Sequence, residues 1–175
     1  HFVLPEENGQ QLILTDENFA FGNQKWRGSG VAIPVFSLRS QNGCGIGEFS
    51  DLKLLVDWTH DLGMNMIQVL PVNDTIANKT WLDSYPYAAI SVFALHPLYI
   101  NLQDIAVLKD SSDQKALQAA AKSLNSLEQV DFEKVLATKF LYLRKLYEQE
   151  YETFIKDKEV AKFISQNESW LKSYA

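Results

Sequence analysis

Residues 30–37, Gly-Val-Ala-Ile-Pro-Val-Phe-Ser, form a short and almost continuous apolar run, and residues 64–71, Met-Asn-Met-Ile-Gln-Val-Leu-Pro, form a second one. Runs of this length are typical of strands that are buried on both faces of a parallel sheet. The segment 49–62 between them carries apolar residues on one side, and this pattern favours a helix. Gly63, which follows it, is a typical residue at the end of a helix. We therefore expect residues 30–37 and 65–71 to be adjacent parallel strands joined by helix 49–62, in a protein of the α/β class.

Composition excludes several classes of protein. The chain has 175 residues, with 22 acidic against 16 basic side chains, so it lacks the basic surface that nucleic acid requires. No apolar run approaches the ~20 residues that cross a membrane, and no signal peptide is visible, which predicts a cytoplasmic protein. The single cysteine, Cys44, excludes an internal disulfide framework. A zinc site of Cys and His alone would need that thiol and all three histidines, so we predict no metal site and no cofactor.

Three segments differ in character. Residues 1–29 are a weakly patterned lead-in, in which Asp16 could begin a short helix. Residues 30–110 hold the two strands, their helix and a long loop. Residues 111–175 are predicted to form a helical subdomain, with helices over residues 114–127, from Asp131 onward, and over residues 158–164 and 168–174. The expected helix caps are Ser112 and Asp113 for the first of these helices and Asp131 for the second. The expected buried stripe of the long helix consists of Phe132, Leu136, Phe140, Leu143, Tyr147 and Tyr151.

The glycine-rich loop over residues 43–47 follows a strand and precedes a helix, as phosphate-binding loops do, but it lacks their spacing and their lysine. We interpret its glycines as the requirement of tight turns with positive φ. Cys44 has no neighbouring base and is interpreted as a partly buried thiol. His60 falls late in the predicted helix, where a solvated cation is favoured.

Two carboxylates, Asp74 and Asp83, lie in the long loop after the second strand. Glycoside chemistry needs one carboxyl group as acid and a second as nucleophile, and these two side chains could form such a pair. The alternative, which we favour, is that Asp74 stabilises the turn at 73–75 and Asp83 the turn at 83–84.

The same loop, residues 71–100, is rich in aromatic residues. Trp81, Tyr85 and Tyr87 lie close to the polar side chains of Asp83 and Ser84. Sugar sites combine flat rings with hydroxyl and carboxylate groups, so this composition is compatible with sugar binding. Aromatic side chains in a proline-rich loop can also serve packing alone.

Several sequence blocks resemble one known family. They occur in order at residues 26–31 (Trp-Arg-Gly-Ser-Gly-Val), 37–40 (Ser-Leu-Arg-Ser), 45–52 (Gly-Ile-Gly-Glu-Phe-Ser-Asp-Leu), 68–75 (Gln-Val-Leu-Pro-Val-Asn-Asp-Thr), 83–87 (Asp-Ser-Tyr-Pro-Tyr), 91–100 (Ser-Val-Phe-Ala-Leu-His-Pro-Leu-Tyr-Ile) and 170–175 (Trp-Leu-Lys-Ser-Tyr-Ala). These blocks resemble the start of the amylomaltases, or 4-alpha-glucanotransferases, of glycoside hydrolase family seventy-seven. The Asp-Ser-Tyr-Pro-Tyr form is most similar to the larger branch of the family, which carries starch-binding modules.

The resemblance implies a partial (β/α)8 TIM barrel, contributing its first two βα units and a helical insertion. It also implies an enzyme that cleaves an α-1,4-glucan by retaining double displacement and passes the donor to the 4-hydroxyl of a second sugar. The family's three catalytic acids lie on later barrel strands, so no catalytic residue is assigned here and the isolated chain is expected to be inactive.

The resemblance also implies a substrate-binding role for part of the aromatic loop. By position, Tyr87 would stack against the donor sugar, Asp83, Ser84 and Tyr85 would line the same loop, and Asp74 would lie close. His96 stands where the family commonly has Asn, a change expected to alter a turn contact.

The favoured hypothesis is therefore an N-terminal part of a glucanotransferase, with a glucan or maltooligosaccharide donor and a sugar acceptor as its partners. Two alternatives are open, a non-catalytic glucan-binding module and a helical protein-interaction domain. A sheet with only two readable strands would have open edges, so we also expect self-association of the isolated chain.

Overall fold

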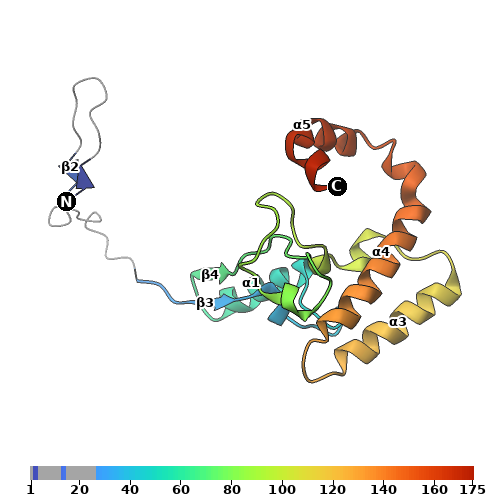
Figure 1. The fold of residues 1–175 in the computed structure, drawn as a ribbon. Helices are drawn as coiled ribbons and strands as arrows, with labels where there is room; N and C mark the ends of the chain where they lie inside the picture. Colours follow the sequence, from blue (N-terminus) through green and yellow to red (C-terminus); the bar gives the residue numbers. More distant parts are fainter. Residues whose placement is uncertain (1, 4–12, 15–26) are drawn as a thin grey trace.

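A computed structural model describes residues 2–3, 13–14 and 27–175 of the chain (Figure 1). The predicted helix at Asp16 lies outside these residues. In chain order the elements are β1 (Phe2–Val3), β2 (Ile13–Leu14), β3 (Gly30–Ile33), the 3-10 helix η2 (Val35–Ser37), α1 (Phe49–Asp61), β4 (Met66–Val69), η3 (Trp81–Ser84), η4 (Pro97–Tyr99), α2 (Leu102–Ile105), α3 (Ser111–Asn125), α4 (Phe132–Phe154) and α5 (Lys158–Tyr174). Among these described elements, no helix is long and apolar enough to cross a membrane.

The predicted strand-helix-strand unit is confirmed. β3 and β4 pair in parallel, with Gly30 opposite Met66 and Ile33 opposite Val69, and α1 connects them. The first strand is shorter than the predicted 30–37, because Pro34 has no N–H for a ladder and the chain turns into η2 after it. The remaining apolar residues of the run leave the sheet, and Val35 enters the core instead.

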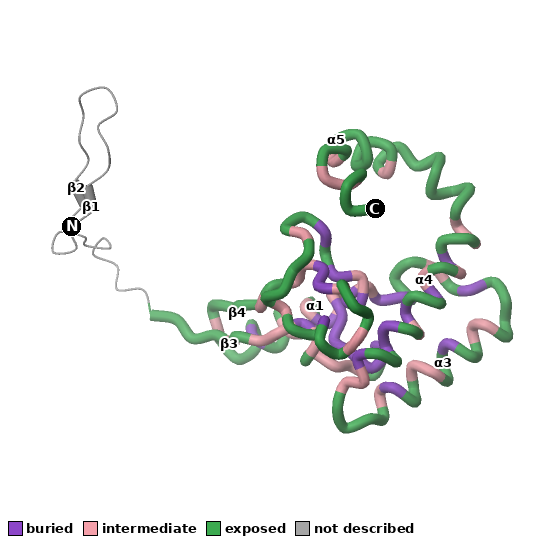
Figure 2. Tube along the Cα trace, viewed as in Figure 1, coloured by how far each residue is buried: buried purple, intermediate pink, exposed green. Residues whose placement is uncertain are grey.

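The expectation that both strands are buried on both faces is wrong for the described chain. Every residue of β3 and β4 is exposed or only half-buried (Figure 2). A parallel strand becomes buried only when layers cover both sides of its sheet. Here the sheet has two strands with α1 packed beside them. The apolar side chains of these strands are therefore suited to burial, but no other described residues cover them fully.

The main hydrophobic core lies beyond the strand ends, where η2, the glycine-rich turn, η4 and the ends of α3 and α4 meet. Its buried residues are Val35, Cys44, Ile46, Leu98, Tyr99, Leu124, Phe132, Val135 and Leu136. Gly45 has φ +79°, and a Cβ there would lie 2.6 Å from the Cβ of Leu124. At Gly47 a Cβ would lie 1.8 Å from the carbonyl oxygen of Val35. The turn interpretation is thus confirmed at Gly45 through its positive φ, whereas Gly47 serves close approach.

The long helix α4 begins after Asp131, as predicted, but the predicted stripe is only partly buried: Phe132 and Leu136 are buried, whereas the stripe's other aromatic residues are exposed. Tyr147 is 52% exposed and Phe140 is 42% exposed. The buried side chains are Phe132, Val135, Leu136, Lys139, Tyr142 and Leu146. The second core, which α4 shares with α2 and α3, consists of Leu102, Leu108, Leu117, Tyr142 and Leu146. A lysine at the centre of this face hides it from a search for apolar periodicity.

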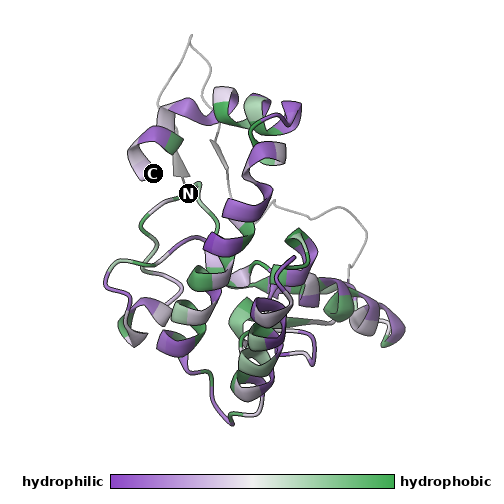
Figure 3. Ribbon diagram, turned by 90° about the vertical axis from the view of Figure 1, so that its right-hand side faces the viewer, coloured by the Kyte–Doolittle hydropathy of each residue, from purple (hydrophilic) through white to green (hydrophobic). Residues whose placement is uncertain are grey.

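Two other helix boundaries differ from the predictions. The carboxylate of Asp110 caps α3 by accepting from the backbone N–H of Ser112 and of Asp113, so the helix begins one residue before the predicted Ser112 cap. The two short helices predicted near the C-terminus form one helix, α5, that lies across the far end of α4 (Figure 3). The amide of Asn167 donates to the carbonyl of Phe163 at 2.8 Å and accepts from the indole N–H of Trp170 at 2.9 Å. This polar side chain is therefore satisfied inside the helix and does not interrupt it.

The two halves of the described chain are joined by a buried ion pair. The ammonium of Lys139 on α4 donates to the carboxylate of Glu48, which occupies the N-cap position of α1. The side chains are 0% and 1% exposed. The same ammonium donates to the carbonyl of Leu98 at 2.6 Å and to that of Ile100 at 2.8 Å. All three protons of the ammonium thus have an acceptor, as a buried cation requires.

Burial acts on both members of the pair. It raises the pKa of the Glu48 carboxyl above its usual value, and the nearby ammonium of Lys139 opposes that shift. Burial likewise lowers the pKa of Lys139, opposed by the charge and hydrogen bond of Glu48. Each group therefore depends on the other to remain charged, and removing one partner leaves an uncompensated buried charge.

We predict that Lys139→Ala lowers the free energy of unfolding by about 3–5 kcal/mol at pH 7, measured by urea denaturation. Because the native-state pKa of Glu48 is raised, the native variant takes up a proton more readily than its unfolded chain does. The loss should therefore be smaller at pH 5 than at pH 7. The control is Lys134→Ala, which removes an exposed pair with Asp131 on the same helix and should lower the free energy of unfolding far less than Lys139→Ala does. Equal losses for the two variants would contradict the assignment.

Candidate functional site

The candidate site is built on the long connection between β4 and α2, which begins at the C-terminal end of a parallel strand, a common place for functional loops. The base of this connection is closed by backbone pairing. The N–H of Asp74 donates to the carbonyl of Ala94 at 2.9 Å, and the N–H of His96 donates to that of Val72 at 2.9 Å. An isolated antiparallel bridge joins Asn73 to Leu95. The residues between these two ends therefore form a closed loop rather than a free tail.

Asp83 organises the interior of the loop. Its carboxylate accepts from the backbone N–H groups of Ala77, Asn78 and Lys79, at 3.2, 2.8 and 2.6 Å. The side-chain amide of Asn78 adds a fourth donor at 3.3 Å. Burial raises the pKa of this carboxyl, but the donors outweigh it and the net pKa is lowered. The structure thus gives Asp83 a turn-stabilising role, at residues 77–79 rather than at the predicted 83–84.

Asp74 is buried as well, at 4% exposure. Its Oδ1 accepts from the N–H of Ile76 at 2.9 Å, which is the side-chain turn expected for this residue. Its Oδ2 accepts from the phenol of Tyr174 at the end of α5. Asp74 and Asp83 therefore both bond to the protein itself, and neither stands free as one of a pair of carboxylates facing a substrate.

The aromatic residues of the loop have the opposite placement. Trp81, Tyr85 and Tyr87 are 67%, 62% and 59% exposed. The rings of Tyr85 and Tyr87 lie with centroids 5.5 Å apart and planes inclined by 49°. The backbone N–H of Trp81 donates to the carboxylate of Glu133 at 3.2 Å, and this hydrogen bond connects this part of the loop to α4. We call Tyr85 and Tyr87 the tyrosine platform, since they offer two exposed rings on an internally bonded loop.

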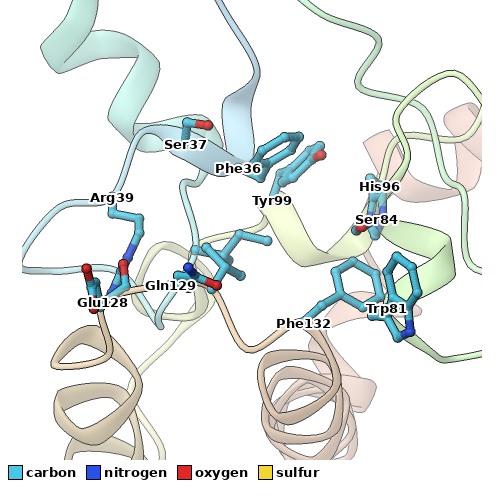
Figure 4. Close-up of a pocket in the computed structure, with 12 residues that line it drawn as sticks. Phe36, Ser37, Arg39, Trp81, Ser84, His96, Tyr99, Glu128, Gln129 and Phe132 are labelled. Carbon is cyan, nitrogen blue, oxygen red and sulfur yellow. The ribbon is translucent and has the colours of Figure 1, made fainter.

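A pocket of about 550 Å³ opens between η2, η3, η4 and the connection from α3 to α4, and neither tyrosine of the platform lines it. Figure 4 shows Arg39 and Glu128 on one side of it and Trp81 and Phe132 on the other, with Tyr99 between them. Its lining residues are Phe36, Ser37, Arg39, Ile46, Trp81, Ser84, His96, Tyr99, Glu128, Gln129, Val130 and Phe132. Of the five predicted site residues, Ser84 is the one that lines this pocket.

Sequence reasoning missed most of the pocket wall. The guanidinium of Arg39 donates to the carbonyls of Asn125 and Leu127 at 2.9 and 2.8 Å, which caps the C-terminal end of α3. His96 is buried, its Nδ1 accepts from the N–H of Leu98 at 3.3 Å, and its ring lies 4.9 Å from that of Tyr99. His96 therefore caps η4 through its ring, and the expected change in this turn relative to the family's usual Asn stays a prediction. The contacts of Arg39 span more than 80 residues, so no local pattern could have indicated them.

Other titratable groups have structural or solvated positions. Cys44 is fully rather than partly buried, and burial raises the pKa of its thiol to about 11, so it is not a ready nucleophile. His60 lies exposed in the last turn of α1 beside Asp61, as expected. Within the described part of the chain, no group of three or more His, Cys, Asp or Glu residues has the arrangement of a metal site.

Comparison with known proteins identifies the family of the chain. The model of glycoside hydrolase family 77, described as 4-alpha-glucanotransferase, matches residues 33–175. The chain belongs to this family. It is 44% identical over 164 residues to 4-alpha-glucanotransferase DPE2 of Oryza sativa subsp. japonica, covering 94% of this chain and 17% of that protein. It is 34% identical over 146 residues to the 4-alpha-glucanotransferase of Chlamydia caviae, and 32% identical over 152 residues to that of Chlamydia muridarum. Each of these matches covers 83% of this chain and 27% of the relative.

This member of the 4-alpha-glucanotransferase family spans about a sixth to a quarter of the length of these relatives. The matched region includes β4, the platform and all the helices from α1 onward. The loop that carries the platform therefore lies inside the part of the chain that matches the family model.

We predict that Asp83→Ala lowers the free energy of unfolding by about 2–4 kcal/mol at pH 7, because three backbone donors lose their acceptor. The native-state pKa of Asp83 is lowered, so its contribution is present above the usual value of 3.8 and lost as the pH falls through the native value. The difference from the wild type should therefore shrink at pH 3. The control is Asp57→Ala on the exposed surface of α1, expected within about 0.5 kcal/mol of wild type. Urea unfolding at both pH values tests this, and a pH-independent difference would refute it.

Proposed function

We propose that this chain supplies the donor-side part of an enzyme that transfers α-1,4-glucan segments between maltooligosaccharides or glucans. The observation that carries the proposal is the tyrosine platform, which consists of two exposed rings on one loop. The carboxylates of that loop bond to its own backbone and hold its shape. Covering an exposed aromatic ring removes apolar surface from water, which favours binding of a ligand there. The apolar C–H face of a sugar ring suits such a surface. Membership of the 4-alpha-glucanotransferase family gives that ligand its chemical class.

The architecture that we propose for the whole protein is a (β/α)8 barrel. The parallel pair β3 and β4 with α1 supports it, since this is the repeating unit of that fold. Residues 111–175 would be the helical insertion, joined to the barrel part through Lys139 and Glu48. The remaining strands would come from outside these 175 residues and would cover the exposed faces of β3 and β4.

Within this proposal the described residues bind and orient sugar, and they do not perform the bond chemistry. Tyr87 would stack on the donor sugar, with Tyr85 and the hydroxyl of Ser84 beside it, while Asp83 and Asp74 hold the loop. In a retaining transfer, a carboxylate attacks C1 of the donor sugar and breaks its glycosidic bond, while a carboxylic acid protonates the departing oxygen and a shortened glucan leaves. The 4-hydroxyl of the acceptor then gives its proton to that same acid, now a base, attacks C1 and releases the nucleophilic carboxylate. We assign neither the nucleophile nor the acid to this chain.

A non-catalytic glucan-binding module would use the same platform but would release the bound glucan unchanged, so activity measurements separate the two hypotheses. The helical protein-interaction hypothesis draws on α5, in which Phe163 and Ile164 are 51% and 47% exposed. Self-association through the open edges of β3 and β4, and a cytoplasmic location, stay predictions.

We predict that Tyr87→Ala weakens the binding of maltoheptaose to the chain by about three- to tenfold, because a stacked ring contributes on the order of 0.5–1.5 kcal/mol. Isothermal titration would measure this affinity. In the full-length enzyme, the fractional loss of turnover should exceed the fractional loss of the free energy of unfolding. The matched control is Tyr147→Ala, which removes a 52% exposed ring from α4. Equal affinities of the two variants, or equal turnover of Tyr87→Ala and wild type at saturating substrate, would defeat the assignment.

The isolated chain should show no glucanotransferase or hydrolase activity. Positioning groups without a nucleophile do not form the covalent intermediate. Incubation of the purified chain with maltotriose, followed by chromatography of the oligosaccharides, should show no redistribution of chain length. Redistribution that survives removal of contaminating enzymes would show that a catalytic pair lies within these 175 residues.

A further inference from the structure

The last turns of α5 contact the loop that carries the tyrosine platform. The ring of Trp170 stacks on that of Phe93, with centroids 5.5 Å apart and planes inclined by 22°. One turn later, the phenol of Tyr174 donates to Oδ2 of Asp74, a residue 100 positions earlier in the sequence. No residue of α5 is fully buried. These directed contacts therefore attach the end of the helix to the loop without forming a core.

Asp74 is the point at which the two ends of the loop are held together. Its backbone N–H donates to the carbonyl of Ala94, and its backbone carbonyl accepts from the N–H of Ile90 at 2.8 Å. Its side chain accepts from the N–H of Ile76 on the other side of the loop. The tyrosine platform lies between Ile76 and Ile90 in the sequence. A constraint on the orientation of Asp74 therefore acts on both segments that lead to the platform.

The phenol of Tyr174 is a durable donor for this carboxylate. Burial raises the pKa of Tyr174 to about 12, and the hydrogen bond to Asp74 and the negative charge of Asp74 act in the same direction. The phenol thus keeps its proton at neutral pH. Hydrogen bonds to an ionised acceptor are about twice as strong as those between neutral groups.

The alternative role for Asp74 is direct contact with substrate, as its place beside the platform had suggested. That role would require an accessible oxygen. The side chain is buried, and Oδ1 and Oδ2 already accept from Ile76 and Tyr174. The geometry therefore favours an indirect role, in which Asp74 transmits the position of α5 to the loop.

We propose that Tyr174 is a positioning residue for sugar binding, which holds the tyrosine platform in its binding geometry through Asp74. The proposal rests on the proposed function for the ligand of the platform. The contact itself is independent of that function. It assigns to the end of the helical insertion a part in substrate recognition, although none of its side chains need touch the sugar.

The first test compares Tyr174→Phe with Tyr151→Phe in the 175-residue chain. Tyr174→Phe removes one hydroxyl and keeps the ring, and Tyr151→Phe makes the same change at a 42% exposed tyrosine on α4. Amide hydrogen exchange followed by NMR should be about tenfold faster at Ile76 and Ile90 in Tyr174→Phe. Exchange at Val135, inside α4, should be unchanged. The affinity for maltoheptaose should fall by at least about threefold in Tyr174→Phe and stay at the wild-type value in Tyr151→Phe.

The second test uses Asp74 itself. In Asp74→Asn, Oδ1 can still accept from Ile76 and the amide can donate to the oxygen of Tyr174, so the direction of the bond reverses but the bond is kept. Exchange and affinity should therefore stay within about threefold of wild type. Asp74→Ala loses both bonds and should match or exceed the effect of Tyr174→Phe.

The outcomes separate this proposal from the proposed function. Wild-type exchange at Ile76 and Ile90 in Tyr174→Phe would overturn the positioning role, as would faster exchange with unchanged affinity. A wild-type chain that fails to bind maltoheptaose would overturn the proposed function of the platform. In that event the exchange data alone would decide whether Tyr174 orders the loop.

Discussion

The buried pair of Lys139 and Glu48 is the interaction on which the rest of the structure depends. It joins residues 91 positions apart, at the cap of α1 and in the middle of α4. Its ammonium also holds the carbonyls of Leu98 and Ile100, so the strand-end turn, the segment after the aromatic loop and the long helix meet at one cation. A buried charge tolerates little displacement of its partners, and it therefore specifies how the helical part docks on the strand-helix-strand unit.

The aromatic loop repeats this logic on a smaller scale. Asp83 gathers three backbone donors and Asp74 joins the two sides of the loop, while Tyr85 and Tyr87 stay at the surface. Acidic residues next to exposed rings suggest catalysis when only their order is known. The carboxylates instead bond to the backbone of the loop and fix its shape, whereas the rings are exposed to solvent. For the transfer reaction that we propose, the acids therefore need not be sought among the loop carboxylates.

Features that depend on neighbours in the sequence could be predicted. The apolar runs and Gly63 indicated the parallel pair with its helix, and Asp131 indicated the start of α4. The ordered blocks around Tyr87 indicated the family, which the comparisons show. Features that depend on distant partners could not, as the contacts between the guanidinium of Arg39 and the end of α3 illustrate. The single helix α5 was missed for a local reason. Residues 158–164 and 168–174 are predicted as two helices, but the amide of Asn167 between them bonds to Phe163 and Trp170 one turn away.

The sequence by itself determined the strand-helix-strand unit, the start of α4 and the family, because hydrophobic period, capping residues and motif order are properties of short segments. The tertiary structure decided which face of α4 is buried and that Arg39 caps α3 across a wide separation. It also decided that the carboxylate of Asp74 accepts a hydrogen bond from Tyr174 rather than from solvent. The physical reason is that a buried polar group must find a partner wherever the fold supplies one, and the chain places that partner in space rather than in sequence.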